Sequence, residues 1–260
     1  MSSTMKILLC LILCLTSNSK VVAQSPLFRV LAFYNTRVEP DHVDFARDAI
    51  SFYKHLATER HFQFDTTTDW SRMNPADLKK YEVVLWLNFF PTTAEQRNGF
   101  TEYMEKGGGW IGFHVAGYND KYTQWPWFVQ FMGGAVFHNN NWPPLPARLH
   151  VEPTRHQVTR HLPADYVSPA NEWYQWIPSP REQKDIQVLV TLDPSNYPLG
   201  RKNLLTFGDI PVVWTNKKFH MLYINMGHGD KIFTDSVQNK MYEDAIMWVG
   251  QKAGKSLLNK

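Results

Sequence analysis

Four polar side chains follow apolar segments that have the composition of buried strands. Asn35 follows LFRVLAFY, Asn88 follows VVLWL, His114 ends WIGFH, and His228 comes shortly after MLYIN. In an open parallel sheet, ligands bind outside the carboxyl ends of the strands, so we expect these side chains to meet at one rim. An imidazole there can act as a general base, a general acid or a metal ligand. The alternative for His114 is a half-buried histidine that bonds a neighbouring loop.

Two carboxylates accompany the histidines. Asp230 lies two residues after His228 and can orient that imidazole or share a proton with it, although a structural loop is an equal alternative. Glu172 lies in NEWYQW, where polar and aromatic residues alternate at strand spacing. It can bind hydroxyls or move a proton, or it can belong to a half-buried edge strand. We therefore predict His114, His228, Glu172 and Asp230 as catalytic residues.

Aromatic and amide side chains near the predicted rim are suited to a sugar. Rings match the apolar faces of a sugar, whereas amides and carboxylates match its hydroxyls, and core packing is the alternative for each tryptophan. The loop HNNNWPP at 138–144 can close over the site. The predicted substrate-binding residues are Asn35, Asn88, His138, Trp142, Trp173 and Trp176.

The ten histidines raise the question of a metal. No HExxH, HxH or other closely spaced ligand motif occurs, so spacing alone does not assign one. A divalent ion held by His114, His228 and a carboxylate stays open, and no other cofactor is indicated. The chain has no P-loop and no GxGxxG, and its three glycines at 107–109 end a helix and open a strand, the reverse of a dinucleotide-binding turn.

Strands alternate with helices in the first half of the chain. Apolar residues at three- and four-residue spacing predict a helix over about 43–59, and a Thr92–Glu95 capping box predicts another that ends near Glu105. This alternation predicts right-handed crossovers and a mostly parallel, doubly wound α/β sheet. We expect strands at 27–34, 61–65, 83–87, 110–114, 147–151, 171–176, 187–192, 211–215 and 220–225, short helices at 75–79 and 125–132, a last helix at 235–251, and loops at 138–144 and 152–170.

The first two dozen residues have the pattern of a secretory signal peptide. Lys6 precedes the apolar run ILLCLILCL, and a small residue, Ala23, offers a cleavage point before Gln24. The run is shorter than the roughly 20 residues that a membrane-spanning helix needs, although a retained anchor is the alternative. We therefore expect a signal peptide at 1–23, a single domain at 25–252, no membrane span after cleavage, and a periplasmic or secreted protein.

Removal of that segment changes the charge and the chemistry of the 260-residue chain. Both cysteines and two of the 27 basic residues lie in it, so the mature chain would be thiol-free and nearly neutral, with 24 acidic residues. This excludes a disulfide scaffold, a cysteine nucleophile and a thiolate metal site, and it argues against a nucleic-acid partner. The aromatic content of 14% excludes disorder.

Four segments of the chain form a recognisable series: GGGWIGFHVA (107–116), RHQVTRHLP (155–163), NEWYQW (171–176) and PVVWTNKKFHMLYINMGHGD (211–230). In this order they resemble the landmarks of the ThuA-like, or trehalose-utilisation, family. The resemblance implies a three-layer α/β/α flavodoxin-like sandwich related to class I glutamine amidotransferases, and a role in carbohydrate metabolism that includes oxidised 3-keto glycosides as substrates.

The resemblance also carries expectations for individual residues. Amidotransferases carry a catalytic cysteine at a strand-ending elbow and a late His-x-Glu, whereas this chain has His114 in the elbow region and His228-Gly229-Asp230 as its late motif. Because the mature chain would lack cysteine, amidotransferase activity is not expected. Family members often have a histidine followed by proline after the short helix; here His138 is followed by Asn139, which departs from that pattern.

These features support two classes of function. The first is an exported enzyme that acts on a sugar or 3-keto glycoside by acid/base or metal-assisted chemistry, as a lyase, isomerase or hydrolase. A 3-keto group acidifies the neighbouring C–H, so one base and one acid suffice for elimination or isomerisation. The second is a non-catalytic carbohydrate-binding or accessory protein on the same scaffold. A metal-dependent hydrolase of another substrate is a third alternative.

Overall fold

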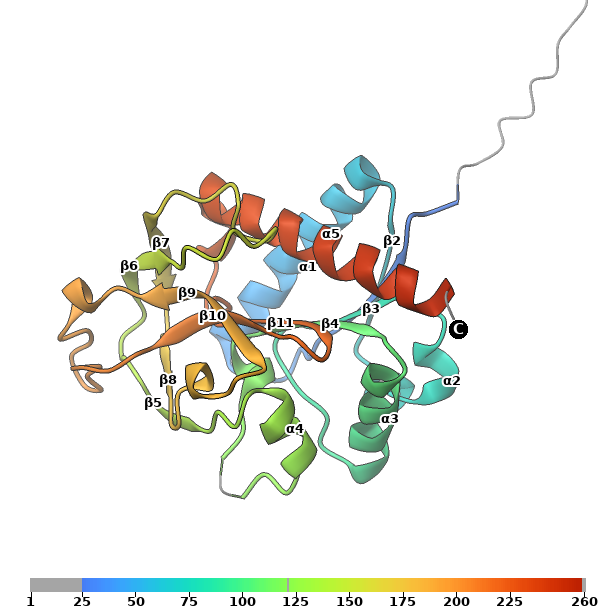
Figure 1. Cartoon of the computed structure of the whole chain (residues 1–260), viewed down its shortest axis with the longest axis horizontal. Helices are drawn as coiled ribbons and strands as arrows, with labels where there is room; N and C mark the ends of the chain where they lie inside the picture. Colours follow the sequence, from blue (N-terminus) through green and yellow to red (C-terminus); the bar gives the residue numbers. More distant parts are fainter. Residues whose placement is uncertain (1–24, 121, 259–260) are drawn as a thin grey trace, which may run out of the picture.

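The computed structural model of the chain describes residues 25–120 and 122–258 (Figure 1). The predicted signal peptide and its cleavage point lie outside these residues. Among the described helices, none combines the length and the apolar character that a bilayer span requires.

A nine-stranded sheet forms the middle layer of the molecule, in the order β2-β1-β3-β4-β11-β10-β9-β6-β7. The first five of these strands are parallel neighbours, and the remaining pairs are antiparallel, so that β10 and β6 run against the other seven. The strands are β1 (Arg29–Phe33), β2 (Gln63–Thr67), β3 (Val83–Trp86), β4 (Gly109–Phe113), β6 (Leu145–Val151), β7 (Asp165–Asn171), β9 (Ile186–Leu192), β10 (Pro211–Asn216) and β11 (His220–Ile224). A separate two-stranded sheet pairs β5 (Phe137–Asn140) with β8 (Tyr174–Trp176).

Helices cover both faces of the large sheet. The helices α1 (Pro40–Arg60) and α5 (Ser236–Leu258) lie on one face, and α3 (Ala94–Glu105) and α4 (Pro126–Phe131) lie on the other (Figure 1). The short helix α2 (Pro75–Leu78) packs beside α3. Single 3-10 turns complete the chain: η1 (Trp70–Arg72), η2 (His114–Gly117), η3 (Pro180–Glu182), η4 (Pro194–Asn196) and η5 (Ile232–Thr234).

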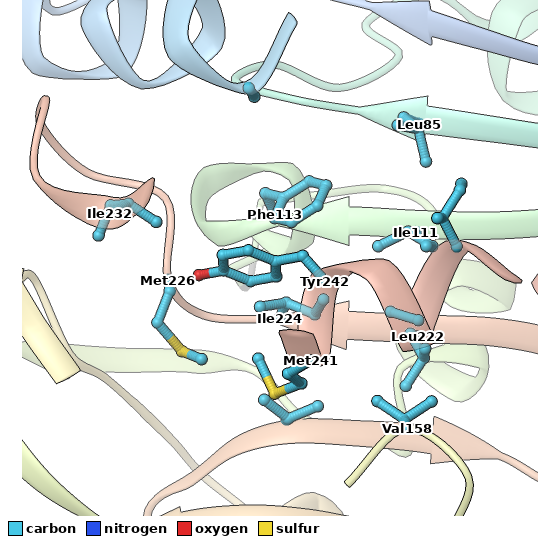
Figure 2. Packing of buried hydrophobic residues seen from close by; sticks show 14 of the residues in the cluster. Leu85, Ile111, Phe113, Val158, Leu222, Ile224, Met226, Ile232, Met241 and Tyr242 are labelled. Carbon is cyan, nitrogen blue, oxygen red and sulfur yellow. The ribbon is translucent and has the colours of Figure 1, made fainter. Parts of the chain in front are cut away.

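Alternate residues of each central strand feed two separate cores. In β1, Val30 and Ala32 pack with α1 and α5, whereas Leu31 and Phe33 pack with the α3 and α4 side. Strands that are apolar on both faces are typical of a sheet covered by helices on both sides. In the first core, Phe113 of β4 meets Tyr242 of α5, with ring centroids 6.1 Å apart (Figure 2). The predicted three-layer α/β/α architecture is confirmed.

Several local predictions were wrong. The capping box of α3 uses Thr93 and Gln96, not Thr92 and Glu95: the Thr93 hydroxyl accepts from the Gln96 N–H, and the Gln96 side chain accepts from the Thr93 N–H. The segments 138–144 and 152–170, predicted as loops, contain β5 and β7. The predicted strand 171–176 is divided, because β7 ends at residue 171 and the chain turns before β8.

Replacing Gly99 with alanine is expected to destabilise the protein, although alanine normally favours a helix interior. An added Cβ would lie 2.3 Å from the carbonyl oxygen of Met73, whose backbone cannot easily move. We expect a loss of about 1–3 kcal/mol in the free energy of unfolding, measured by urea denaturation. Asn98→Ala, at an exposed position of the same helix, is the matched control and should cost nothing. Equal stability of both variants would contradict the close packing of α3.

Candidate functional site

Three histidines and one glutamate converge beyond the carboxyl ends of β4 and β11. His42 comes from the first turn of α1, His114 follows β4, His228 follows β11, and Glu172 lies between β7 and β8. One ligand atom from each residue lies within 4.8 Å of those of the other three. The imidazole centroids are 5.0, 5.2 and 5.4 Å apart, so the rings form a nearly equilateral triangle.

The imidazoles are buried, yet each has an unused nitrogen. His42, His114 and His228 are 8%, 0% and 1% exposed, and the Nε2 atom of each lacks a hydrogen-bond partner among the described residues. A buried polar atom without a partner costs about 1–3 kcal/mol. Three such atoms that face one another therefore indicate a site for an electron-pair acceptor, which the folded chain does not itself supply.

Glu172 presents one defined oxygen to the histidines. Its Oε1 accepts a hydrogen bond from the side-chain amide of Asn140 at 2.9 Å. Its Oε2 lies 3.5 Å from Nε2 of His114 and 3.8 Å from Nε2 of His228. The carboxylate is thus oriented by β5, with its second oxygen available to the cluster.

The hydrogen bonds of His114 determine its tautomer. Its Nδ1 lies 2.9 Å from the carbonyl oxygen of Asn225, which can only accept, so Nδ1 carries the hydrogen and Nε2 keeps its lone pair. The Tyr223 hydroxyl donates to the carbonyl oxygen of His114, and the Tyr174 ring packs 4.1 Å from the imidazole. His114 has a φ of +48°, a left-handed conformation that non-glycine residues rarely adopt, so this packing holds it in a strained turn.

Burial keeps two of the histidines in the neutral form that can donate electrons to a metal. Burial, followed by the neighbouring His114 and His228, lowers the pKa of His42 to about 2. Burial and His228 hold the pKa of His114 well below its usual value, against the opposing hydrogen bond to Asn225. Burial also raises the pKa of Glu172, against the attraction of His228. Three nitrogens and one carboxylate oxygen suit zinc, manganese, iron, cobalt or nickel, and not calcium or magnesium.

Acidification below pH 6.5 is expected to destabilise the metal-free protein. Above pH 6.5, His42 and His114 are neutral in both the folded and the unfolded chain; below it, only the unfolded chain takes up protons. The free energy of unfolding should therefore fall by about 1.4 kcal/mol per pH unit for each histidine. Urea denaturation at pH 7, 6 and 5 with a chelator measures this slope. In His42→Leu, unfolding should take up about one proton fewer, so the free energy of unfolding should depend less steeply on pH. The same slope as in the wild type would contradict a neutral His42 in the folded protein.

The structure places Asp230 away from the role predicted for it. Its carboxylate pairs with Lys231 at 3.0 Å. The described carboxylates within 4 Å of the His228 ring nitrogens are instead those of Glu39, Asp41 and Glu172. Asp41 Oδ2 lies 3.6 Å from Nδ1 of His228, so the carboxylate that can orient this histidine comes from α1.

The predicted aromatic residues divide into one near the site and two in the core. Trp142 is half-buried, and its ring lies 6.4 Å from that of His228. The prediction that Trp173 and Trp176 stack on a sugar is wrong, because both are fully buried. Trp173 donates its indole N–H to the carbonyl of Leu145, and Trp176 packs against the rings of the second core. His138 is exposed on β5, outside the cluster.

Asn35 and Asn88 are hydrogen-bonded to each other next to the start of α1. The Asn88 side chain accepts from the Asn35 N–H at 2.8 Å and donates to the carbonyl oxygens of Asn35 at 2.9 Å and His42 at 3.0 Å. Asn88 therefore links the end of β3 to the turn that carries His42. Their predicted contact with a substrate stays a prediction.

A buried asparagine connects the segments of Glu172 and His228. The Asn171 side-chain oxygen accepts from the N–H groups of Gly227 and His228, each at 3.1 Å. Its amide donates to the carbonyl oxygen of Glu172 at 2.6 Å. Asn225 extends this network, because its side-chain oxygen accepts from the Tyr174 N–H at 3.2 Å.

Three residues of the site, His42, Glu39 and Asp41, were not predicted from the sequence. A signal for His42 was present: it lies three residues before Phe45 and so continues the apolar stripe of α1 with a polar side chain. A histidine on the buried face of a helix, next to the predicted rim, is a candidate ligand. Glu39 and Asp41 lie outside the predicted start of that helix and had no comparable signal.

Comparisons with known proteins agree with this architecture. A family model described as trehalose utilisation (ThuA) matches residues 29–249. A solved structure described as a ThuA-like protein, from Bacteroides uniformis, is 51% identical, has a TM-score of 0.85, and aligns over 87% of this chain and 93% of its own. A second protein so described, from Parabacteroides merdae, is 16% identical with a TM-score of 0.63 over 87% and 91% of the two chains.

A more distant similarity concerns the fold alone. A protein from Thermoplasma acidophilum described as a component of GMP synthase is 8% identical, with a TM-score of 0.53 over 90% of this chain and 98% of its own. No sequence among the curated proteins matches the chain.

Proposed function

Because the chain belongs to the ThuA, or trehalose-utilisation, family, we propose that it is a metal-dependent enzyme that acts on a sugar or 3-keto glycoside. One observation carries this proposal: the three unpartnered Nε2 atoms of His42, His114 and His228 face one another beside Glu172. Sugar hydroxyls can also donate to imidazole nitrogens, but four ligand atoms within 4.8 Å of one another match the ligand set of a single ion better than a row of separate hydroxyl contacts.

The four residues fit a divalent ion, and each would contribute one ligand atom. The Nε2 atoms of the three histidines and Oε2 of Glu172 would be its ligands. His114 donates its other N–H to a backbone carbonyl, and Asp41 is placed to accept from His228. Such outer partners are typical of metal-binding histidines. An ion bound there supplies a Lewis acid that polarises a carbonyl or hydroxyl oxygen.

The remaining groups would bind and position the sugar. Trp142 lies at the edge of the cluster and can offer a ring face to the apolar side of a pyranose. Amide and carboxylate groups around the cluster can accept hydrogen bonds from hydroxyls. A 3-keto group would acidify the neighbouring C–H, so that proton transfer, without a covalent nucleophile, suffices for elimination or isomerisation.

The test begins with metal content. Protein purified without a histidine tag should hold about one equivalent of a transition metal by elemental analysis. It should then be incubated with a panel of native and 3-keto glycosides, with and without a chelator. We expect product from at least one glycoside, loss of activity with chelator, and no activity in His114→Ala or Glu172→Ala. His138→Ala is the control. Sugar binding without turnover in any of these proteins would instead support the accessory role.

The proposed enzyme would act outside the cytoplasm. The support is the pattern of residues 1–23, in which a lysine precedes a short apolar run and a small residue ends the segment. Amino-terminal sequencing of protein expressed in its exporting host should give Gln24 as the first residue. A chain that retains residue 1 in the membrane fraction would contradict cleavage.

A further inference from the structure

We infer that this site accepts uncharged sugars and rejects sugars that carry a carboxylate or phosphate, because Glu39 and Asp41 make its mouth acidic. The inference rests on the proposed function, since it names the substrate class of the same site. These two residues form the acidic mouth of the site.

Three carboxylates surround one buried histidine. Glu39 Oε1 and Glu172 Oε2 lie 3.4 and 3.8 Å from Nε2 of His228, and Asp41 Oδ2 lies 3.6 Å from its Nδ1. The imidazole is fully buried, and both nitrogens lack a hydrogen-bond partner among the described residues, so it is aimed into this group. The side chains of Glu39 and Asp41 are 44% and 45% exposed, against 12% for Glu172. They are therefore the part of the site that an incoming ligand meets.

The negative charge of the mouth is not neutralised by the chain. The ion pairs that Glu39 and Asp41 make in the described structure are with His42 and His228. A bound divalent ion would offset only two of the three carboxylates. The site therefore keeps a net negative charge with or without the ion.

The first basic residue after Asp41 on α1 and the first basic residue after His228 both pair with other carboxylates. On α1, Arg47 pairs with Asp44 at 2.7 Å and with Asp48 at 3.1 Å. After β11, Lys231 pairs with Asp230 at 3.0 Å. A site for phosphate or carboxylate normally presents arginine or lysine to the ligand. Here Arg47 and Lys231 point their charge elsewhere, and Arg37, two residues before Glu39, forms no ion pair with Glu39 or Asp41 in the described part of the chain.

The amino end of α1, which would otherwise attract an anion, is already filled. Pro40 has no N–H, and the N–H groups of His42 and Val43 donate to the Glu39 carbonyl oxygen at 3.0 and 3.1 Å. The Glu39 side chain makes no capping bond to the helix, so its carboxylate faces the histidines. The N–H groups of His42 and Val43 are therefore not free to bind a sugar phosphate, and Pro40 has none to offer.

This arrangement suits a polyhydroxy compound without charge. Hydroxyl groups can donate hydrogen bonds to the two exposed carboxylates, and a ligand carbonyl carries no charge to repel them. An anionic sugar would place a like charge within several ångströms of Glu39 or Asp41, at a distance where screening by salt is incomplete. The acidic mouth would therefore act as a filter for charge at the point of entry.

The test compares one sugar with its own uronate. The neutral glycoside that binds the wild-type protein most tightly in the panel is titrated beside the same glycoside oxidised to a carboxylate at its primary alcohol. We expect the uronate to bind at least about tenfold more weakly at low salt, with the gap narrowing at high salt. In Glu39→Gln/Asp41→Asn, compared with wild type at equal metal occupancy, the gap should close to about twofold through tighter binding of the uronate.

A control removes the same number of negative charges, one from α1 and one from the segment after β11. Asp44→Asn/Asp230→Asn should leave the ratio of the two affinities at the wild-type value. Equal binding of both sugars by wild type, no binding of either, or an unchanged ratio in Glu39→Gln/Asp41→Asn would overturn the inference. Absence of metal or of turnover, with the ratio intact, would refute the proposed enzyme and leave the charge filter standing.

Discussion

Replacing His114 with alanine is expected to lower the affinity for a divalent ion by at least about 100-fold and to abolish turnover. Loss of an outer partner of a metal ligand already costs 10- to 100-fold. His114 is a proposed ligand itself, and it is the one whose tautomer the structure fixes most firmly, through Nδ1 and the Asn225 carbonyl.

The measurement is equilibrium dialysis against zinc and manganese, followed by elemental analysis. Thermal unfolding gives a second readout, because an ion at 100 times its Kd stabilises the wild type by about 2.7 kcal/mol. His114→Ala should lose that stabilisation, whereas His138→Ala, at an exposed position of β5, should retain it. Equal metal content in wild type and His114→Ala would show that His114 is not a ligand and would contradict the proposed ligand set.

The pattern of residues predicted the parallel half of the fold well. Four of its five strands, β1, β3, β4 and β11, are apolar runs because helices cover both faces, and such runs stand out in a sequence, whereas the edge strand β2 is mostly polar. The strands of the antiparallel half were harder to predict from the sequence. The edge strand β7 contains Pro169 and mixes polar with apolar residues, so its pairing with β6 left little trace in composition.

The same contrast applies to the site. The rule that ligands bind beyond the carboxyl ends of strands led to His114 and His228, since each follows a strand. His42 belongs to a helix, and only the folded chain brings it within 5.2 Å of His114, as measured between ring centroids. Asp230 was chosen because it lies next to His228 in the sequence, yet Asp41, far away along the chain, is the carboxylate beside the imidazole.

Asn171→Leu is the second change with a large expected effect, because it removes the link between the Glu172 and His228 segments. The two N–H groups of Gly227 and His228 would lose their shared acceptor, and all of these groups are buried. Each unsatisfied buried group costs about 1–3 kcal/mol, so we expect a loss of about 2–4 kcal/mol in the free energy of unfolding. Metal affinity should fall by about 10- to 100-fold, as expected for loss of an outer support.

Asn171→Asp separates positioning from packing. Aspartate keeps an oxygen for the N–H groups of Gly227 and His228 but loses the amide that donates to the Glu172 carbonyl. It should therefore hold the His228 segment and release that of Glu172, so that its metal affinity lies between those of wild type and Asn171→Leu. Urea denaturation and metal titration of the three proteins measure both effects. If Asn171→Leu kept wild-type metal affinity in its folded state, the histidines would be held by their own strands, and the asparagine would serve stability alone.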